Sequence, residues 1–167
     1  MMTRRPARRL RRWSVAAAAL IAAVTMPPPA FGEPSETKPE AAASDPDYAA
    51  GKAALDREDW REAAGRFTKA ALRDPDNADL QNYLGYSYRN LGQLDRAFQH
   101  YKRALELNPR HRGAHEYAGE AYLMVGDLAR AEEHLAALRK ICLIPCEELG
   151  DLERHIAEYR KKTGAQR

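Results

Sequence analysis

A 34-residue period runs through the middle of the chain and constrains its fold more than any other feature. Two sets of small residues recur at this interval: Gly51, Gly85, Gly119 and Ala63, Ala97, Ala131. Pro75 is followed by Pro109 at the same spacing. Self-similarity at a fixed interval indicates an array of stacked units, in which each unit buries its apolar face against its neighbours. The period therefore predicts a repeat protein, a class that binds other molecules far more often than it catalyses.

The first 32 residues have the three regions of a secretory signal peptide. Six arginines between Arg4 and Arg12 precede any acidic residue, and the stretch from Val15 to Met26 is apolar and rich in alanine. Ala30-Phe31-Gly32 then gives a cleavage pattern. An uncleaved anchor is less favoured, because this apolar stretch is shorter than the ~20 residues that span a bilayer. The sequence predicts cleavage after Gly32, export to the periplasm, and membrane contact only through the transient signal peptide.

The basic excess of the chain lies in this leader. The chain has 27 Lys and Arg against 24 Asp and Glu, a net charge of +3. Residues 1–32 hold six of the arginines and none of the acids, which leaves 21 basic against 24 acidic residues, a net charge of −3. We therefore expect no nucleic-acid partner, since the excess does not belong to a binding face.

Beyond the leader, proline and polar residues give way to a helical pattern. Residues 33–45 are expected to form a flexible linker. Apolar residues then recur every three or four positions, which predicts paired helices over 46–57, 60–73, 78–91, 94–107, 112–125 and 128–141. Asp59 and Asp127 are the expected N-caps of two of them.

A seventh helix is predicted to cover the last pair. Over residues 146–162, a narrow apolar stripe of Leu149, Leu152, Ile156 and Tyr159 marks an otherwise charged helix. An array needs such a cap for solubility. Residues 163–167 are expected to form a disordered tail.

The recurring glycines imply close packing. Glycine within a helix costs about 1 kcal/mol relative to alanine, so close approach of another helix must offset this cost. We expect Phe67, Tyr101 and Leu135 to fill the space between successive helix pairs and to build one continuous core.

These positions carry a resemblance to the tetratricopeptide repeat (TPR). The middle unit matches it at Leu84, Gly85, Tyr88, Gly92, Ala97, Tyr101, Ala104 and Pro109. The first unit departs from it with Glu58 at the turn glycine, and the third with Leu138 and Leu143 at the alanine and proline positions. Residues 46–145 thus resemble three repeats, about 44–77, 78–111 and 112–145. The resemblance implies an all-α, right-handed superhelical solenoid of three TPR helix pairs plus a capping helix.

The resemblance also implies a concave groove, lined by the first helix of each pair, that binds a protein or peptide segment. The residues at groove positions are Tyr48, Lys52, Asn82, Tyr83, Tyr86, Arg89, Asn90, Glu116, Tyr117, Glu120 and Met124. Tyr83 and Tyr117 have a second interpretation, in which they only pack between neighbouring helices. The set differs from the family's carboxylate clamp, because Tyr48 replaces its first lysine and Lys52 replaces an asparagine.

Cys142 and Cys146 are the only cysteines, and they lie at the junction between the last repeat helix and the capping helix. In an oxidising compartment, an even cysteine count favours a disulfide, here one that fixes the angle of the capping helix. A redox-active pair and a metal site with a third ligand such as His155 are the other interpretations.

The histidines give no strong site. His111 and His115 would share one helix face, which is a weak zinc pattern without an acidic partner. His100 and His134 occupy one repeat position and are expected to face outward. The sequence contains no recognisable nucleophile and base pair, phosphate-binding glycine loop or pair of catalytic carboxylates, so we expect neither an enzyme nor a cofactor.

Together these features predict a non-catalytic adaptor or assembly scaffold of the cell envelope, monomeric or weakly dimeric, that binds a partner segment in the TPR groove. The alternative is a thiol-redox or metal-handling protein that uses Cys142 and Cys146.

Overall fold

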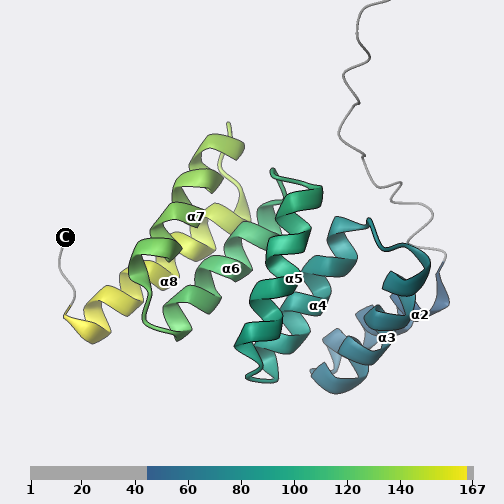
Figure 1. The fold of residues 1–167 in the computed structure, drawn as a ribbon. Coiled ribbons are helices and arrows are strands. Elements are labelled where there is room, and N and C mark those ends of the chain that lie inside the picture. Colours follow the sequence, from purple (N-terminus) through teal and green to yellow (C-terminus); the bar gives the residue numbers. More distant parts are fainter. Residues whose placement is uncertain (1–44, 165–167) are drawn as a thin grey trace, which may run out of the picture. The chain divides into compact units, whose positions relative to one another are not determined.

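The computed structural model describes residues 45–164, and within them the chain forms seven helices and no strand (Figure 1). The helices are α2 (Pro46–Asp56), α3 (Trp60–Arg73), α4 (Ala78–Asn90), α5 (Leu94–Leu107), α6 (Arg112–Met124), α7 (Leu128–Ile141) and α8 (Glu147–Thr163). The predicted signal peptide, the linker up to residue 44 and residues 165–167 lie outside the described residues. None of the described helices is long and apolar enough to cross a membrane.

Side chains that accept hydrogen bonds from backbone N–H groups cap the beginning of five of the seven described helices, all except α5 and α8. Asp45 accepts hydrogen bonds from the N–H groups of Asp47 and Tyr48, at 2.8 and 3.0 Å, before α2. The predicted caps Asp59 and Asp127 are confirmed, since each accepts a bond from the third residue of its helix. The predicted second helices of each pair have the observed bounds, whereas the first helices end one residue or so earlier than predicted.

The turn within each helix pair uses one left-handed residue. The φ angles are 57° at Glu58, 72° at Gly92 and 80° at Gly126. Glycine adopts this conformation freely, whereas a residue with a Cβ is strained there by roughly 1–2 kcal/mol. The missing turn glycine of the first pair is therefore a real local strain, and the backbone keeps the same turn despite it.

In the first two pairs, an aromatic ring from the second helix packs against a glycine of the first. A Cβ on Gly51 would lie 2.7 Å from the Phe67 ring, and one on Gly85 would lie 2.5 Å from the Tyr101 ring. Real Cβ atoms do not approach so closely, so only glycine allows these rings to lie flat on the helix. The predicted role of these two glycines and rings is confirmed.

The third pair departs from this arrangement. Over Gly119 lies Leu152 of α8, whose Cδ2 would be 2.7 Å from a Cβ at that position. Leu135 is buried, but it belongs to a second cluster of buried residues with Ala131, Leu138, Leu152 and Ile156. The prediction of one continuous core is therefore wrong. A leucine is too short to take the place of the aromatic ring, and α8 supplies the missing side chain.

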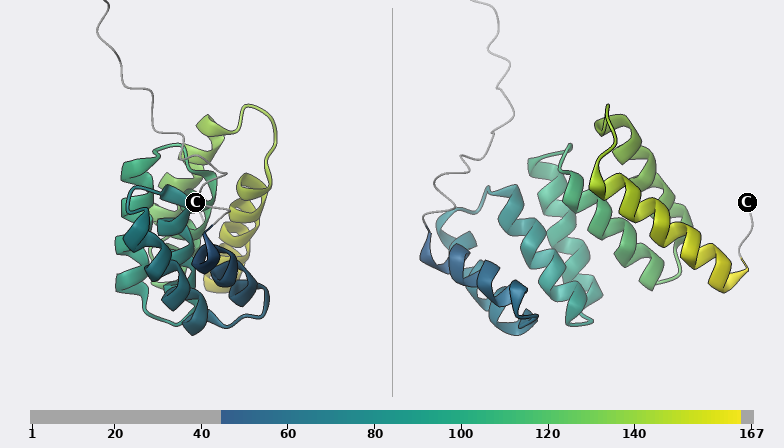
Figure 2. Two further views of the ribbon diagram at one scale, coloured as in Figure 1. Left: turned by 90° about the vertical axis from the view of Figure 1, so that its right-hand side faces the viewer. Right: turned by 180° about the vertical axis from the view of Figure 1, so that it is seen from behind.

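Helix α8 packs against both α6 and α7 (Figure 2). Leu152 and Ile156 are its buried residues. Two ion pairs with α7 hold its exposed side: Arg139 lies 2.8 Å from Glu153, and Arg160 pairs with Glu132. Thr163, which the sequence placed in the tail, is the last residue of α8, and Gly164 ends the helix at φ 68°.

Candidate functional site

The residues at the predicted groove positions lie on the first helices of the three pairs, and we call the surface that they form the first-helix face. It consists of Tyr48 and Lys52 on α2, of Asn82, Tyr83, Tyr86, Arg89 and Asn90 on α4, and of Glu116, Tyr117, Glu120 and Met124 on α6. Side-chain contacts connect these helices in order, from α2 to α4, from α4 to α6 and from α6 to α8.

Aromatic packing joins α2 to α4. The Tyr48 ring meets the Tyr83 ring edge-on at 5.9 Å, and the Tyr83 ring stacks on Phe67 at 5.1 Å. Lys52 donates from Nζ to the Tyr83 hydroxyl at 3.3 Å. Burial, together with the neighbouring Tyr83, raises the pKa of Tyr48. Tyr83 thus packs between neighbouring helices, as its second interpretation expected, and it also carries a polar contact on the face.

Two tyrosines and an arginine form the centre of the first-helix face. The rings of Tyr86 and Tyr117 lie 4.7 Å apart. The guanidinium of Arg89 lies 5.1 Å from the first ring and 5.4 Å from the second, within the range of a cation–π contact. Trp60 of α3 meets Tyr86 edge-on at 5.7 Å. This arrangement offers a rigid, partly apolar contact surface.

Glu120 connects three helices. Its carboxylate forms an ion pair with Arg89 of α4, and its Oε1 lies 2.8 Å from Nδ1 of His155 on α8. The side chains of Arg89 and Glu120 are only 12% and 13% exposed. These two predicted groove residues therefore neutralise each other, and much of their charge is already satisfied within the chain.

A pocket opens beside this cluster, between α4, α6 and α8. It has a volume of about 350 Å³. Its lining includes Arg89, Glu120, Met124, His155, Tyr159 and Lys162. Met124 is 57% exposed, so the pocket presents an accessible, adaptable apolar side chain next to the charged cluster.

Two polar residues of the first-helix face are buried without a partner. Glu116 is 7% exposed and makes no hydrogen bond or ion pair within residues 45–164. Burial, followed by the nearby carboxylates of Asp151 and Glu148, raises the pKa of Glu116 to about 7. Asn82 is 4% exposed, and its Oδ1 has no hydrogen-bond partner.

The remaining predicted residues lie toward solvent or serve the fold. Asn90 is exposed and donates to the backbone oxygen of Tyr86 at 2.9 Å. Burial and the neighbouring Glu116 raise the pKa of Tyr117 to about 12. Tyr117, like Tyr83, is partly buried against the core, so both tyrosines have a packing role as well as a place on the face.

The histidines behave differently from the sequence expectations. His111 caps α6, and its Nε2 lies 2.9 Å from Oδ1 of Asp79. This contact lowers the pKa of the Asp79 carboxyl. Nδ1 of His115 lies 3.0 Å from Nδ1 of His134. The prediction that His100 and His134 face outward is wrong: His100 stacks on a tyrosine, and burial lowers the pKa of His134 to about 4. An imidazole has an apolar body, which neighbouring aromatic rings cover.

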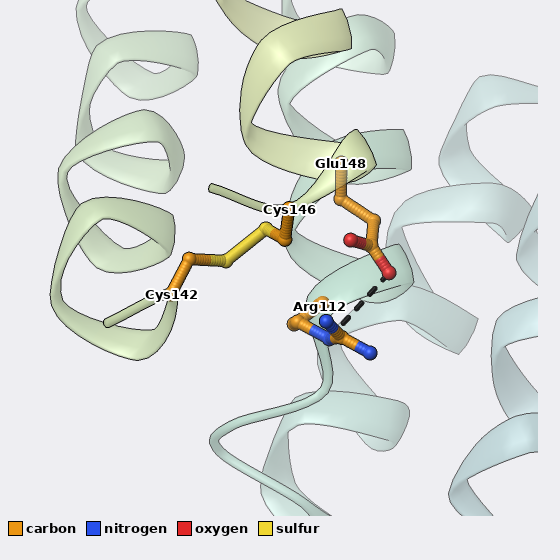
Figure 3. Close-up of a disulfide and its surroundings, with 4 residues drawn as sticks. All are labelled: Arg112, Cys142, Cys146 and Glu148. Carbon is orange, nitrogen blue, oxygen red and sulfur yellow. Dashed lines mark ion pairs between the residues drawn. A yellow bond between two sulfur atoms is a disulfide. The ribbon is translucent and has the colours of Figure 1, made fainter. Parts of the chain in front are cut away.

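Cys142 and Cys146 are joined as a disulfide in the segment between α7 and α8 (Figure 3). Their Cα atoms are 6.0 Å apart. Beside the disulfide, Arg112 of α6 lies 3.5 Å from Glu148 of α8. The bridge therefore closes the segment from which α8 begins.

The structure does not support a metal site formed by the two cysteines and His155. The proposed third ligand, His155, lies against Glu120. In the described part of the chain, His, Cys, Asp and Glu residues form no group of three or more that could hold a metal ion.

Sequence reasoning missed the part that three residues play in the site. His155 lies outside the repeated segment, so it has no repeat position. Trp60 begins the second helix of a pair, whereas the resemblance assigns the groove to the first helices. Their contacts with Glu120 and Tyr86 depend on how separate helices pack. Tyr101 is a third case, because its buried hydroxyl, which has no hydrogen-bond partner, lies within the electrostatic influence of Arg89.

The fold and the face define a class of protein: an all-α solenoid of helix pairs that presents a contact surface on its first helices. Comparison with models of known protein families identifies the same kind of repeat. Two family models, each described as tetratricopeptide repeat, match residues 48–110 and 88–141 and together cover more than half of the chain. The chain belongs to the tetratricopeptide-repeat family. No curated protein matches it.

Solved structures with the same fold include several tetratricopeptide-repeat proteins. The Yersinia enterocolitica type III secretion translocator chaperone SycD is 18% identical, with a TM-score of 0.64 over 71% of this chain and 84% of that one. PcrH, in complex with the chaperone-binding region of PopD, is 23% identical, with a TM-score of 0.60 over 71% and 89%. At these identities the likeness shows the fold alone.

The chain spans about half the length of another relative. The structure named MamA MSR-1 C2 is 24% identical, with a TM-score of 0.53, over 57% of this chain and 55% of that chain.

Proposed function

We propose that this chain is a non-catalytic adaptor or assembly scaffold that binds a protein or peptide segment on its first-helix face. The observation that carries this proposal is the arrangement of Tyr86, Tyr117 and Arg89, in which two rings 4.7 Å apart are held beside one guanidinium. Rigid aromatic side chains with polar tips give large contact area at low entropic cost. In the PcrH structure, a protein of the same fold is bound to a segment of another protein.

The proposed location is the cell envelope, after export and cleavage at Gly32. The leader pattern of residues 1–32 supports this location, and so does the Cys142–Cys146 disulfide, because disulfides persist in oxidising compartments. N-terminal sequencing of the processed protein tests it: a chain that begins at Glu33 supports export, and an intact leader contradicts it. The division into repeats at about 44–77, 78–111 and 112–145 stays a prediction.

Affinity capture tests the binding function. The full chain with a C-terminal tag is compared with Tyr86→Ala/Asn90→Ala, which removes two accessible groups of the face and leaves the Arg89–Glu120 pair intact. A matched control, Gln99→Ala/Lys102→Ala, changes two residues of α5 around a different pocket. We expect the same partner to be recovered by the parent and the control and to be lost by the face variant at unchanged helicity. Recovery by all three chains would contradict the proposal.

A further inference from the structure

Glu116 is a buried carboxylate without a cation, and its neighbours make this unusual. Three carboxylates close to it each have an arginine: Glu120 pairs with Arg89, Glu148 lies 3.5 Å from Arg112, and Asp151 lies 2.8 Å from Arg154. Within residues 45–164, Glu116 has neither an ion pair nor a hydrogen bond, although it is 7% exposed. A carboxylate that is largely removed from water and lacks a partner is unfavourable in its charged form, and a positive charge brought by a bound segment would offset this cost.

A second unpaired acceptor lies close by. Asn82 of α4 packs against the first turn of α6, where a Cβ on Gly113 would lie 3.2 Å from its Nδ2. Glu116 is one turn further along the same helix. The Oδ1 atom of Asn82 is buried and accepts no hydrogen bond. Two helices thus present two acceptor groups, a carboxylate and an amide oxygen, and neither has found a donor in the chain.

The surroundings favour a cation and disfavour an anion. Glu147, Glu148 and Asp151 at the start of α8 add negative potential at Glu116, and Arg89 opposes it. Arg89 is already paired with Glu120. Tyr117 lies within the electrostatic influence of Glu116, and an aromatic ring is a surface on which the aliphatic stem of a long basic side chain packs.

We propose that Glu116, with Asn82 as second acceptor, receives a lysine or arginine side chain of the segment bound on the first-helix face. This inference rests on the proposed function and specifies its partner: a segment that carries a basic residue at a fixed position. Such a side chain brings the charge and the N–H donors that both groups lack. A segment that ends in a free carboxylate or is rich in acidic residues would instead meet Glu116 and the carboxylates at the start of α8.

Selection from a displayed library of random peptides tests the inference. The full chain and Glu116→Gln are used in parallel as baits. Peptides recovered on the parent should share Lys or Arg at one position, and those recovered on Glu116→Gln should lose this preference. Glu148→Gln is the matched control, because it removes a neighbouring carboxylate that already has an arginine, and it should keep the preference.

A double-mutant cycle with a recovered peptide measures how strongly its basic residue and Glu116 are coupled. Replacing its basic residue by norleucine should weaken binding to the parent by about tenfold or more and binding to Glu116→Gln by much less, because the coupling between the two groups is already absent from that variant. Asn82→Ala should weaken binding of the basic peptide more than that of the norleucine peptide. If Glu116→Gln does not fold, the cycle with Asn82→Ala takes its place, and equal losses for the two peptides on that variant would overturn the inference.

The outcomes separate this inference from the proposed function. A preference for Asp, Glu or a free carboxylate on the parent chain would overturn the inference, as would a basic preference that survives in Glu116→Gln. Peptides that depend on Tyr86 yet show no basic preference would overturn the inference and leave the proposed function standing. If no recovered peptide depends on Tyr86, both fail.

Discussion

Leu152 lies directly over Gly119, so close that a Cβ on the glycine would come within 2.7 Å of the leucine Cδ2. The first two helix pairs cover the corresponding glycines, Gly51 and Gly85, with an aromatic ring from their own second helix. The third pair instead takes this side chain from α8. The capping helix therefore completes the core of the last pair. We expect α8 and the last helix pair to unfold together.

Gly119→Ala is predicted to destabilise the chain by about 1–3 kcal/mol, because the new methyl group overlaps Leu152 and forces α8 to shift. Chemical denaturation followed by circular dichroism measures the change. Gly150→Ala is the control: a Cβ there meets nothing within 4 Å, and it should stabilise the chain by about 0.5–1 kcal/mol through the usual preference of helices for alanine. Equal effects at the two positions would contradict the packing role of Leu152.

Glu58→Gly is predicted to stabilise the chain by about 0.5–1 kcal/mol. Glu58 has a φ angle of 57°, which strains a residue with a Cβ, and the relief of this strain outweighs the added freedom of glycine in the unfolded chain. Gly92→Ala, at φ 72° in the next pair, should show the opposite sign. Urea denaturation midpoints, at an unchanged m-value, measure both stability changes. A less stable Glu58→Gly variant would show that the glutamate side chain stabilises the fold by more than the backbone strain costs.

Removal of the disulfide is predicted to lower the free energy of unfolding by about 2 kcal/mol on the chain-entropy relation for so short a loop. Cys142→Ala/Cys146→Ala and the parent chain under a thiol reductant should behave alike, since both free the segment between α7 and α8. Denaturation midpoints measure the loss.

The same variant separates the two function classes. An adaptor should keep its partner when the cysteines are replaced, because the first-helix face lies on α2, α4 and α6. A thiol-handling protein should lose its function while its stability stays near that of the parent. The second result would overturn the proposed function and favour a function carried by Cys142 and Cys146.

Glu116 should make the stability of the chain depend on pH. Its pKa is raised from 4.5 to about 7 in the folded chain, mainly by burial, so between these pH values the folded chain holds more protons than the unfolded chain. The free energy of unfolding therefore falls as pH rises through this range. Glu116→Gln removes the charged form, and we expect it to be about 1–2 kcal/mol more stable than the parent at pH 8 and equal to it near pH 4.5.

Comparison of the two chains isolates Glu116 from the other groups that titrate. The charged and titratable groups that act on it are Arg89 of α4, Tyr117 of α6 and Glu147, Glu148 and Asp151 of α8. They are present in both chains, as is His134, whose lowered pKa acts in the opposite direction at acidic pH. A stability difference that does not change between pH 4.5 and 8 would show that Glu116 titrates normally.

Much of the fold could be predicted from the sequence. The 34-residue period and the three- and four-residue spacing of apolar positions fixed the helix pairs, and the observed helices differ from the prediction by only a residue or so at their ends. The pairing of Gly51 with Phe67 and of Gly85 with Tyr101 also followed, because both partners lie within one repeating unit. These features depend on local conformation and on a repeated local contact.

The candidate site could be predicted only as a set of positions. Which of its side chains are free was decided by contacts between helices from different units: Glu120 forms an ion pair with Arg89 and lies against His155, whereas the Glu116 side chain has no partner within the described residues. Likewise, the place of Leu152 over Gly119 depends on the angle at which α8 returns to α6. Periodicity assigns a residue to a face of its helix, but long side chains choose their partners from whatever the neighbouring helices bring within reach, and that choice exists only once the helices are packed.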